Sequence, residues 1–275
     1  MQLLRLTDRD FEKFSVLIYN KTGIHLKLEK KELLNARLGK RLRARQLVSF
    51  EKYYDLVMND SSGSELVHLI NSVSTNFTSF FREIAHFDFL TSDVLPQLIN
   101  SGGRQSRNIN VWSSASSSGE EPYTLAMVID QFMRVHSEVS CSILATDIST
   151  KVLGVAEKGV YPLERVDKMP KNFLHDYFQR GVGKCSGYVK VKPNIRKLVT
   201  YRRFNLMDQF PWQNEFDVIF CRNVMIYFNK ETQEELVSKF YQSLIPGGFL
   251  FIGHSESLGG MKSKFKQATT TVYQK

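Results

Sequence analysis

Hydrophobic residues recur with two different spacings along this chain, and the spacing changes near residue 109. Before that point they repeat every three or four positions, as at Leu34 and Leu38, which places them on one face of a helix. This spacing predicts a helix over 29–45 and further helix over 50–72. The first part of the chain is therefore predicted to be all helical.

After residue 109, short hydrophobic runs alternate with helical patterns. The runs that predict buried strands lie at 109–112, 142–146, 199–204, 216–221 and 248–253. Such alternation indicates a parallel sheet covered by helices and joined by right-handed crossovers. Residues 160–198 interrupt it with glycine turns and with a stretch at 188–192 in which apolar and basic residues alternate. We therefore predict a small β-rich insertion projecting from the main sheet.

One of these runs also marks a place for chemistry. The hydrophobic run at 218–220 stops abruptly at the polar residues Cys221, Arg222 and Asn223. A run bounded in this way is typical of a strand buried on both faces, and open α/β sheets bind their ligands beyond the carboxyl ends of such strands. Taken alone, the segment is equally consistent with a core strand followed by an ordinary polar loop.

The composition favours a globular protein over a membrane or secreted one. The chain has 275 residues, 42% of them hydrophobic, which is enough for an ordinary core. No run approaches the roughly 20 apolar residues of a membrane span, and the charged amino terminus lacks a signal-peptide core. Its three cysteines are scattered, so we expect no disulfide framework and a reducing, cytoplasmic location. No H-E-x-x-H motif occurs, and we predict no catalytic metal.

The net charge of +9 favours an acidic partner, and one helix concentrates it. Between Lys27 and Arg45 there are eight basic residues and two acidic ones. A solvated surface helix usually mixes its signs. We therefore interpret this helix as a docking surface for an acidic partner, while a plain solvated face stays the alternative. The candidate docking residues are Arg37, Lys40, Arg41, Arg43 and Arg45.

The loop after the first strand resembles the frame of a nucleotide site but carries the wrong charge for phosphate. Residues 113–118 are small and lead into a helix, which allows a ligand to approach the backbone. Neither a G-x-G-x-x-G pattern nor a P-loop is present. Glu120 and Glu121 at the helix start repel phosphate and attract a cation. A ligand with an ammonium group fits better.

A second acid, Asp147, ends the next strand. A carboxylate there can accept hydrogen bonds from both ribose hydroxyls, although it can also cap the following helix, a role that Ser149 fills equally well. Together, Glu121 and Asp147 indicate a ligand with an adenosine end and an amino-acid end, which describes S-adenosylmethionine. Asn76 and Thr78 stand in a Ser/Thr-rich segment that is also compatible with a simple helix start.

Five segments of the chain, in order, closely resemble the CheR family of chemotaxis receptor methyltransferases. They are Ser-Thr-Asn-Phe-Thr-Ser-Phe-Phe-Arg-Glu (74–83), Gly-Glu-Glu-Pro-Tyr (119–123), Ala-Thr-Asp-Ile (145–148), Phe-Cys-Arg-Asn-Val-Met-Ile-Tyr-Phe (220–228) and Gly-His-Ser-Glu-Ser (253–257). The resemblance covers nearly the whole chain from about residue 7. It implies an α/β fold: a Rossmann-like, class I S-adenosylmethionine-dependent methyltransferase domain with a small β-subdomain insertion, preceded by an all-α domain.

The resemblance also implies domain roles and site residues. Residues 1–75 are expected to dock the substrate, 76–108 to form a linker with a cofactor-contacting helix, and 109–275 to form the methyltransferase domain, with the insertion at about 160–198. Arg82 and Tyr227 are the implied catalytic residues. The implied cofactor-binding residues are Asn76, Thr78, Arg82, Glu121, Asp147, Asn205, Leu206, Arg222 and Asn223.

The implied reaction transfers a methyl group from S-adenosylmethionine to glutamates on the cytoplasmic helices of chemoreceptors, leaving S-adenosylhomocysteine. Glutamate has a reference pKa of about 4.3, so its carboxylate is already a nucleophile at neutral pH and needs no general base. We expect catalysis to come from positioning and from removal of water. A covalent mechanism through Cys221 is disfavoured, because a cysteine at a buried strand end usually serves as a small hydrophobe.

In some members of the family the β-insertion also docks a receptor's carboxyl-terminal pentapeptide by strand addition. The turn at Gly181 and Gly183 resembles that subset, and a purely structural hairpin is the alternative. A monomer is the default expectation. Two rival functions remain, a nucleic-acid methyltransferase and a non-catalytic binding module. The few aromatics near the basic run weigh against the first, and the intact Glu121, Asp147 and Arg222 weigh against the second.

Overall fold

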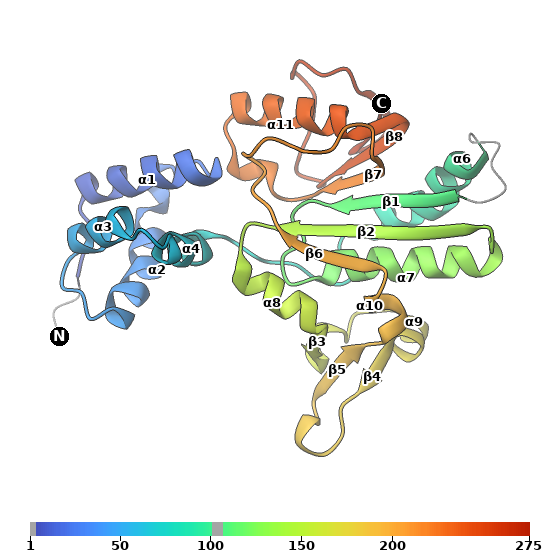
Figure 1. The fold of residues 1–275 in the computed structure, drawn as a ribbon, viewed down its shortest axis with the longest axis horizontal. Coiled ribbons are helices and arrows are strands. Elements are labelled where there is room, and N and C mark those ends of the chain that lie inside the picture. The colour runs from blue at the N-terminus through green and yellow to red at the C-terminus, as the bar shows by residue number, and fades with distance from the viewer. Residues whose placement is uncertain (1–3, 101–106) are drawn as a thin grey trace.

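The computed structural model describes residues 4–100 and 107–275. The first part is all helical, as predicted (Figure 1). Leu34, Leu38 and Leu42 are buried and face the other helices of this region. The four helices are α1 (Asp8–Thr22), α2 (Lys31–Ala44), α3 (Phe50–Asn59) and α4 (Ser64–Val73).

The helix expected over 50–72 is two helices, because a tight turn separates α3 from α4. The carboxylate of Asp60 accepts hydrogen bonds from the backbone N–H groups of Ser62 and Glu65, and Gly63 takes a left-handed conformation with a φ of 67°. An aspartate that bonds the backbone two residues ahead favours a turn over a continued helix.

Residues 74–79 form an extended connection from the helical region to the sheet (Figure 1). Asn76 and Thr78 are therefore not helix caps, and the next helix begins only at α5 (Ala85–Phe89). That helix continues through Leu90–Val94 into α6 (Leu95–Asn100). Residues 101–106, within the expected 76–108 linker, lie outside the described residues.

The central sheet has seven strands in the order β6-β2-β1-β7-β8-β10-β9. The five strands from β6 to β8 are parallel, as predicted, but β10 pairs antiparallel with both β8 and β9. The chain returns from β8 through a loop without a crossover helix, which allows antiparallel pairing. The strands are β1 (Arg107–Ser113), β2 (Val139–Asp147), β6 (Val199–Arg203), β7 (Phe216–Cys221), β8 (Leu244–Ile252), β9 (Lys266–Thr269) and β10 (Val272–Gln274).

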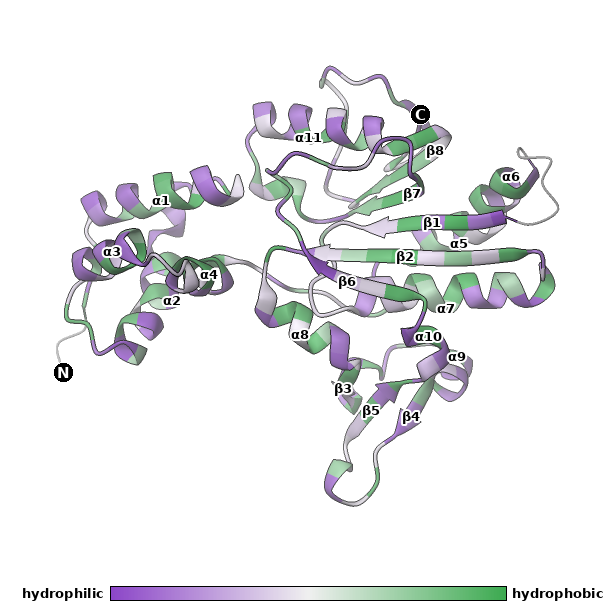
Figure 2. Ribbon diagram, in the orientation of Figure 1, coloured by the Kyte–Doolittle hydropathy of each residue, from purple (hydrophilic) through white to green (hydrophobic). Residues whose placement is uncertain are grey.

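Helices cover both faces of this sheet. On one face, α7 (Glu120–Val135) packs with α5 and α6 over Val111, Ile143 and Phe220. On the other face, α11 (Lys230–Ser243) packs over Trp112 and Ile219. Figure 2 shows hydrophobic residues along the central strands β7 and β8 and more polar residues at the outer strand β6. The sheet is therefore buried on both faces, with its strand ends left as the accessible edges.

The insertion after α8 (Thr150–Lys158) forms a separate three-stranded antiparallel sheet in the order β3-β5-β4 (Figure 1). Val189 and Val191 are buried whereas Tyr188 and Lys190 are exposed, as the alternating pattern predicted. Among the described residues, no helix combines the length and apolar character needed to cross a bilayer. The elements of the insertion are β3 (Val160–Pro162), α9 (Lys171–Tyr177), β4 (Phe178–Arg180), β5 (Tyr188–Val191) and α10 (Pro193–Arg196).

Candidate active site

A cavity of about 890 Å³ lies where the carboxyl ends of β1, β2 and β7 meet the helical region. In the strand order, the chain leaves β1 toward β2 on one side and returns to β7 on the other. Such a switch point is where open α/β sheets bind ligands, and the volume lies within the range of about 300–1,000 Å³ usual for ligand pockets. The position of the cavity therefore matches the place that the polar strand ends indicated.

The cavity gathers the residues to which the sequence assigned cofactor binding and catalysis. They come from the extended connection, from the first turn of α7, and from the ends of β2, β6 and β7. Arg37 of α2 also lines it, whereas the other four candidate docking residues and the two insertion glycines are not part of its wall. The gathered residues are Asn76, Thr78, Arg82, Glu121, Asp147, Asn205, Leu206, Arg222, Asn223 and Tyr227.

Of the two adjacent glutamates, Glu121 reaches the cavity and Glu120 does not. Glu121 accepts hydrogen bonds from the Ser113 hydroxyl at 2.8 Å and from the Arg222 guanidinium at 3.1 Å. Burial raises the pKa of Glu121 and outweighs Arg222 and Ser113, which both lower it. Glu120 is fully buried behind the wall and accepts a bond from the Ser118 hydroxyl at 2.7 Å.

Asp147 ends β2 and is held by the backbone. One carboxylate oxygen accepts the N–H of Ser117 at 2.9 Å and the other accepts the N–H of Ser149 at 2.8 Å. Each oxygen keeps a further lone pair for a ligand hydroxyl. Burial raises the pKa of Asp147, against these hydrogen bonds. Ser149 precedes α8 without capping it, because its hydroxyl donates to the Asn71 side chain at 2.7 Å instead.

Arg222 connects the cavity wall to a second acid, Glu83, that the sequence analysis did not single out. The Arg222 side chain is only 2% exposed, and it donates to Glu83 at 3.0 Å as well as to Glu121. Burial raises the pKa of Glu83, but Arg222 and Asn223 outweigh this and leave it below its ordinary value. A buried guanidinium needs such partners, because an unpaired charge inside a protein is strongly unfavourable.

Another acid, the buried Glu256, organises the loop after β7. Its carboxylate accepts the N–H groups of four consecutive residues, Asn223 to Ile226, at 2.8–3.3 Å, and that of Gly253 at 2.6 Å. A Cβ atom on Gly253 would lie 2.5 Å from the Asn223 amide, so only glycine fits there. Burial still raises the pKa of Glu256. This carboxylate fixes the backbone that leads from Asn223 to Tyr227.

Unusual backbone conformations also cluster around the cavity. Phe81, Glu83, Ser117 and Asn223 have positive φ angles of 53°, 57°, 47° and 56°. Non-glycine residues in this region cost of order 1–3 kcal/mol and persist where surrounding contacts hold them, often at functional sites. Here the contacts are those of Arg222, Glu256 and Asp147.

The mouth of the cavity is basic and partly apolar. Arg82 donates to the carbonyl of Phe77 at 3.0 Å and lies 5.6 Å from the centre of its ring, while the Phe77 side chain itself is 75% exposed. Exposed Lys27 and Lys30 add positive charge from the helical region and outnumber the exposed Glu29 between them. The helical region is tied to this edge by the N–H of His25, which donates to the Tyr227 carbonyl at 2.8 Å.

Several basic side chains of α2 bind groups within the protein, so fewer of them are available to a partner than the sequence suggests. Arg41 and Arg45 both bind Glu65 of α4, at 2.6 Å each, and Glu65 is only 1% exposed. Their charges stabilise the helical region from within. Arg37 donates to the carbonyl of Val73 and to the Thr75 hydroxyl, so it anchors the start of the extended connection. Lys40 and Arg43 are exposed.

Cys221 is fully buried at the end of β7, and burial raises its pKa well above the ordinary value. A thiol in that state is a poor nucleophile, because the reactive form of cysteine is the thiolate. The environment of Cys221 therefore supports its interpretation as a packing residue.

Comparisons with known proteins agree with this architecture. Residues 9–74 match the all-alpha domain of CheR methyltransferases, and residues 76–274 match their SAM binding domain. The chain belongs to the CheR methyltransferase family. A chemotaxis protein methyltransferase of Borreliella burgdorferi is 39% identical over 94% of this chain and 92% of its own length, and one of Escherichia coli is 38% identical over 98% and 92%. This CheR chain is thus a methyltransferase of chemotaxis that uses S-adenosylmethionine.

Among solved structures, an S-adenosylmethionine-dependent methyltransferase from Mesorhizobium loti covers 59% of this CheR chain and 54% of its own, with 16% identity and a TM-score of 0.30.

The cavity itself fits the cofactor, because it presents one carboxylate suited to an amino group and a second suited to ribose hydroxyls. The chain's own residues therefore accommodate the group that the family binds.

Proposed function

We propose that this CheR methyltransferase methylates glutamate side chains of chemoreceptors and so forms glutamyl 5-O-methyl esters. The observation that carries the proposal is the division of charge within one cavity. Two acids, the half-buried Glu121 in the first turn of α7 and the buried Asp147 at the end of β2, lie at the inner end. Cationic Arg82 and the lysines of the helical region lie at the mouth, where they outnumber the exposed Glu29. The inner end suits a cationic cofactor and the outer end suits an anionic substrate.

The chemistry needs little from the protein beyond positioning. Bound S-adenosylmethionine supplies an electrophilic methyl group. The substrate carboxylate is ionised at neutral pH, with a reference pKa of about 4.3, and is already a nucleophile. Arg82 would bind that carboxylate at the mouth, and Tyr227 would orient it. Exclusion of water by Phe77 and by the helical region would then favour attack.

The proposed cofactor contacts follow from the side chains on the wall. Asp147 would accept the ribose hydroxyls, and Glu121 would bind the amino group while Arg222 and Ser113 hold it in place. Asn76, Thr78, Asn205, Leu206 and Asn223 would complete the pocket. In this proposal residues 1–75 dock the receptor, 76–108 link the regions and contact the cofactor, and 109–275 hold the cofactor.

The partner would be an acidic receptor helix in the cytoplasm, approached by the protein as a monomer. Arg37 lines the cavity and Lys40 and Arg43 are exposed, so these three cations are the proposed docking residues, with Arg41 and Arg45 supporting the helix. The edge strand β4 leads into the Gly181–Gly183 turn, which suits strand addition of a receptor peptide.

The test is transfer of a labelled methyl group to receptor-rich membranes, followed by mild base. Carboxyl esters release labelled methanol under these conditions, whereas methylated nucleic acid does not. We expect base-labile label on receptors, lost with Asp147→Ala. Base-stable label or label on nucleic acid would refute the glutamate substrate, and binding of S-adenosylmethionine without transfer would favour a binding module.

Docking is tested separately by reversing one charge. Lys40→Glu should raise KM for receptor membranes and leave the affinity for S-adenosylhomocysteine unchanged. Lys262→Glu makes the same charge change at an exposed position of the loop before β9 and serves as the matched control. Equal effects of the two substitutions on KM would contradict a docking role for α2.

A further inference from the structure

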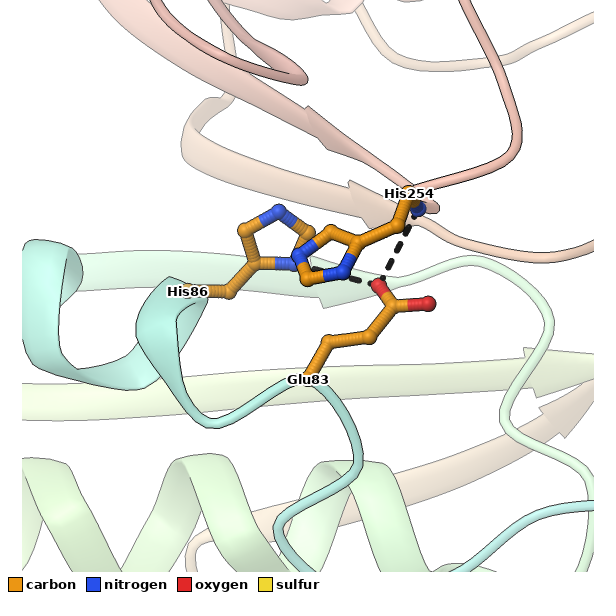
Figure 3. A group of neighbouring side chains, drawn as sticks. All are labelled: Glu83, His86 and His254. Carbon is orange, nitrogen blue, oxygen red and sulfur yellow. Dashed lines mark hydrogen bonds and ion pairs between the residues drawn. The ribbon is translucent and has the colours of Figure 1, made fainter.

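Three side chains from separate segments converge behind the cavity wall. Glu83 follows the extended connection, His86 lies in α5, and His254 follows β8. Their potential ligand atoms all lie within 4.8 Å of one another, and Figure 3 shows the two imidazoles beside the Glu83 carboxylate. His86 is 3% exposed, whereas His254 is exposed and gives access from solvent. Two imidazoles and one carboxylate form a ligand set typical of zinc sites.

The hydrogen bonds around His86 fix which of its nitrogens carries the proton. The Thr271 hydroxyl donates its single proton to the Thr270 carbonyl at 2.7 Å, so it accepts from His86 Nε2, also at 2.7 Å. In the neutral ring, His86 Nδ1 therefore presents a lone pair.

That lone pair faces another acceptor. His86 Nδ1 lies 3.5 Å from a carboxylate oxygen of Glu83, and it is buried without a hydrogen-bond partner among the described residues. The Glu83 oxygen accepts hydrogen bonds from Arg222 and from the His254 backbone N–H at 3.3 Å, whereas His86 Nδ1 has no donor, so a cation between the two atoms would give Nδ1 a partner. The bond from Nε2 to Thr271 also orients the ring, as the outer partners of metal-binding histidines do.

We propose that Glu83, His86 and His254 bind a divalent transition-metal ion such as Zn²⁺, and that this ion inhibits the methyltransferase. Bonds of about 2.0–2.2 Å need the ligand atoms closer together than they now lie. The His254 ring, which is exposed and lies edge-on to the His86 ring with 4.8 Å between their centres, would have to move inward. A water molecule would complete four-coordination. The site is distinct from the cavity wall, because none of these three residues lines the cavity.

Inhibition follows from the sharing of Glu83 with Arg222. The same carboxylate oxygen that faces His86 accepts Arg222 at 3.0 Å. A dication at the site competes for that oxygen and repels the guanidinium, which also holds Glu121. Metal binding should therefore weaken cofactor binding, and the cofactor should weaken metal binding by the same factor. This coupling rests on the proposed role of Glu121, whereas the metal site does not.

The site is tested by titrating Co²⁺ into the purified protein and recording its visible absorption. This absorption increases when the ion exchanges its octahedral shell of water molecules for a four-coordinate protein site. The exposed Cys185 is first changed to serine to remove a competing thiol. We expect one saturable site, weakened at least about 10-fold by His254→Gln. The matched control is His175→Gln, at an exposed histidine in α9. Absence of a saturable site, or equal effects of the two substitutions, would overturn the proposal.

Coupling is tested by measuring S-adenosylhomocysteine affinity calorimetrically with and without Zn²⁺, after subtracting a titration of the ligand into Zn²⁺ alone. Weaker binding with Zn²⁺, restored by His254→Gln, supports inhibition. Unchanged affinity refutes inhibition while leaving the metal site standing. Lack of affinity for S-adenosylhomocysteine in metal-free protein would instead count against the proposed cofactor site.

Discussion

Replacing Glu256 by glutamine tests whether one buried carboxylate holds the loop that carries Asn223 and Tyr227. The carboxylate accepts five backbone N–H groups, three on one oxygen and two on the other. Glutamine has nearly the same shape but one acceptor oxygen. If its oxygen takes the three donors, its NH₂ group faces the N–H groups of Asn223 and Gly253.

The cost can be worked out from those two donors. A buried donor left without an acceptor costs about 1–3 kcal/mol, so two cost about 2–6 kcal/mol. Removing the charge recovers part of this, because burial disfavours the ionised form of Glu256 and raises its pKa. We therefore expect Glu256→Gln to lower the free energy of unfolding by about 2–4 kcal/mol.

The assay is denaturant unfolding of the full chain, combined with steady-state methyl transfer. Because the loop positions Asn223 and Tyr227, kcat calculated per folded molecule should also fall. Glu235→Gln, at an exposed position on α11, is the matched control and should change neither quantity. A loss of stability below about 1 kcal/mol would refute the assignment of five strong hydrogen bonds to Glu256.

Three further predictions follow from single residues. Burial raises the pKa of Glu65, but the bonds from Arg41 and Arg45 outweigh it and leave this pKa below its ordinary value of 4.5. Ionised Glu65 therefore stabilises the folded protein above pH 4.5, and this stabilisation is lost as the pH falls below 4.5. The difference in denaturation midpoint between the parent chain and Glu65→Gln should shrink as the pH is lowered below 4.5. Asp147→Asn should weaken S-adenosylhomocysteine binding about 10- to 100-fold by calorimetry, with both proteins equally folded by circular dichroism. Gly181→Ala should loosen the insertion in limited proteolysis, because its Cβ would lie 2.0 Å from the Cys185 carbonyl oxygen, whereas Gly154→Ala, in open space, should not.

The sequence predicted the position of the cavity because a simple geometric rule applies to it. Carboxyl ends of parallel strands meet at one edge of a sheet, so Asp147, at the end of β2, and Arg222, just after β7, had to lie near each other. Periodicity likewise predicted the buried leucines of α2 and the alternating exposure of β5. These predictions depend only on local spacing and on strand direction.

Other features depended on contacts that no local pattern encodes. The basic run of α2 looked uniformly available, but a single buried acid on α4 binds Arg41 and Arg45. The antiparallel β10 was missed because its run is only three residues long. Asn76 and Thr78 have the residue types of helix caps, and only the sheet edge that they face shows why the chain stays extended there.

The acids missed by sequence reasoning share one physical trait. Glu83 and Glu256 bind protein groups, whereas Glu121 and Asp147 also reach the cavity. Glu83 accepts from the Arg222 guanidinium and the Asn223 side-chain amide, and Glu256 accepts from a series of backbone N–H groups, which are identical in every sequence. The weak signals were their positions within the quoted motifs: Glu83 ends the segment 74–83, and Glu256 is the single acid of the segment 253–257. Carboxylates within such motifs beside a predicted site therefore merit consideration as supports for its loops.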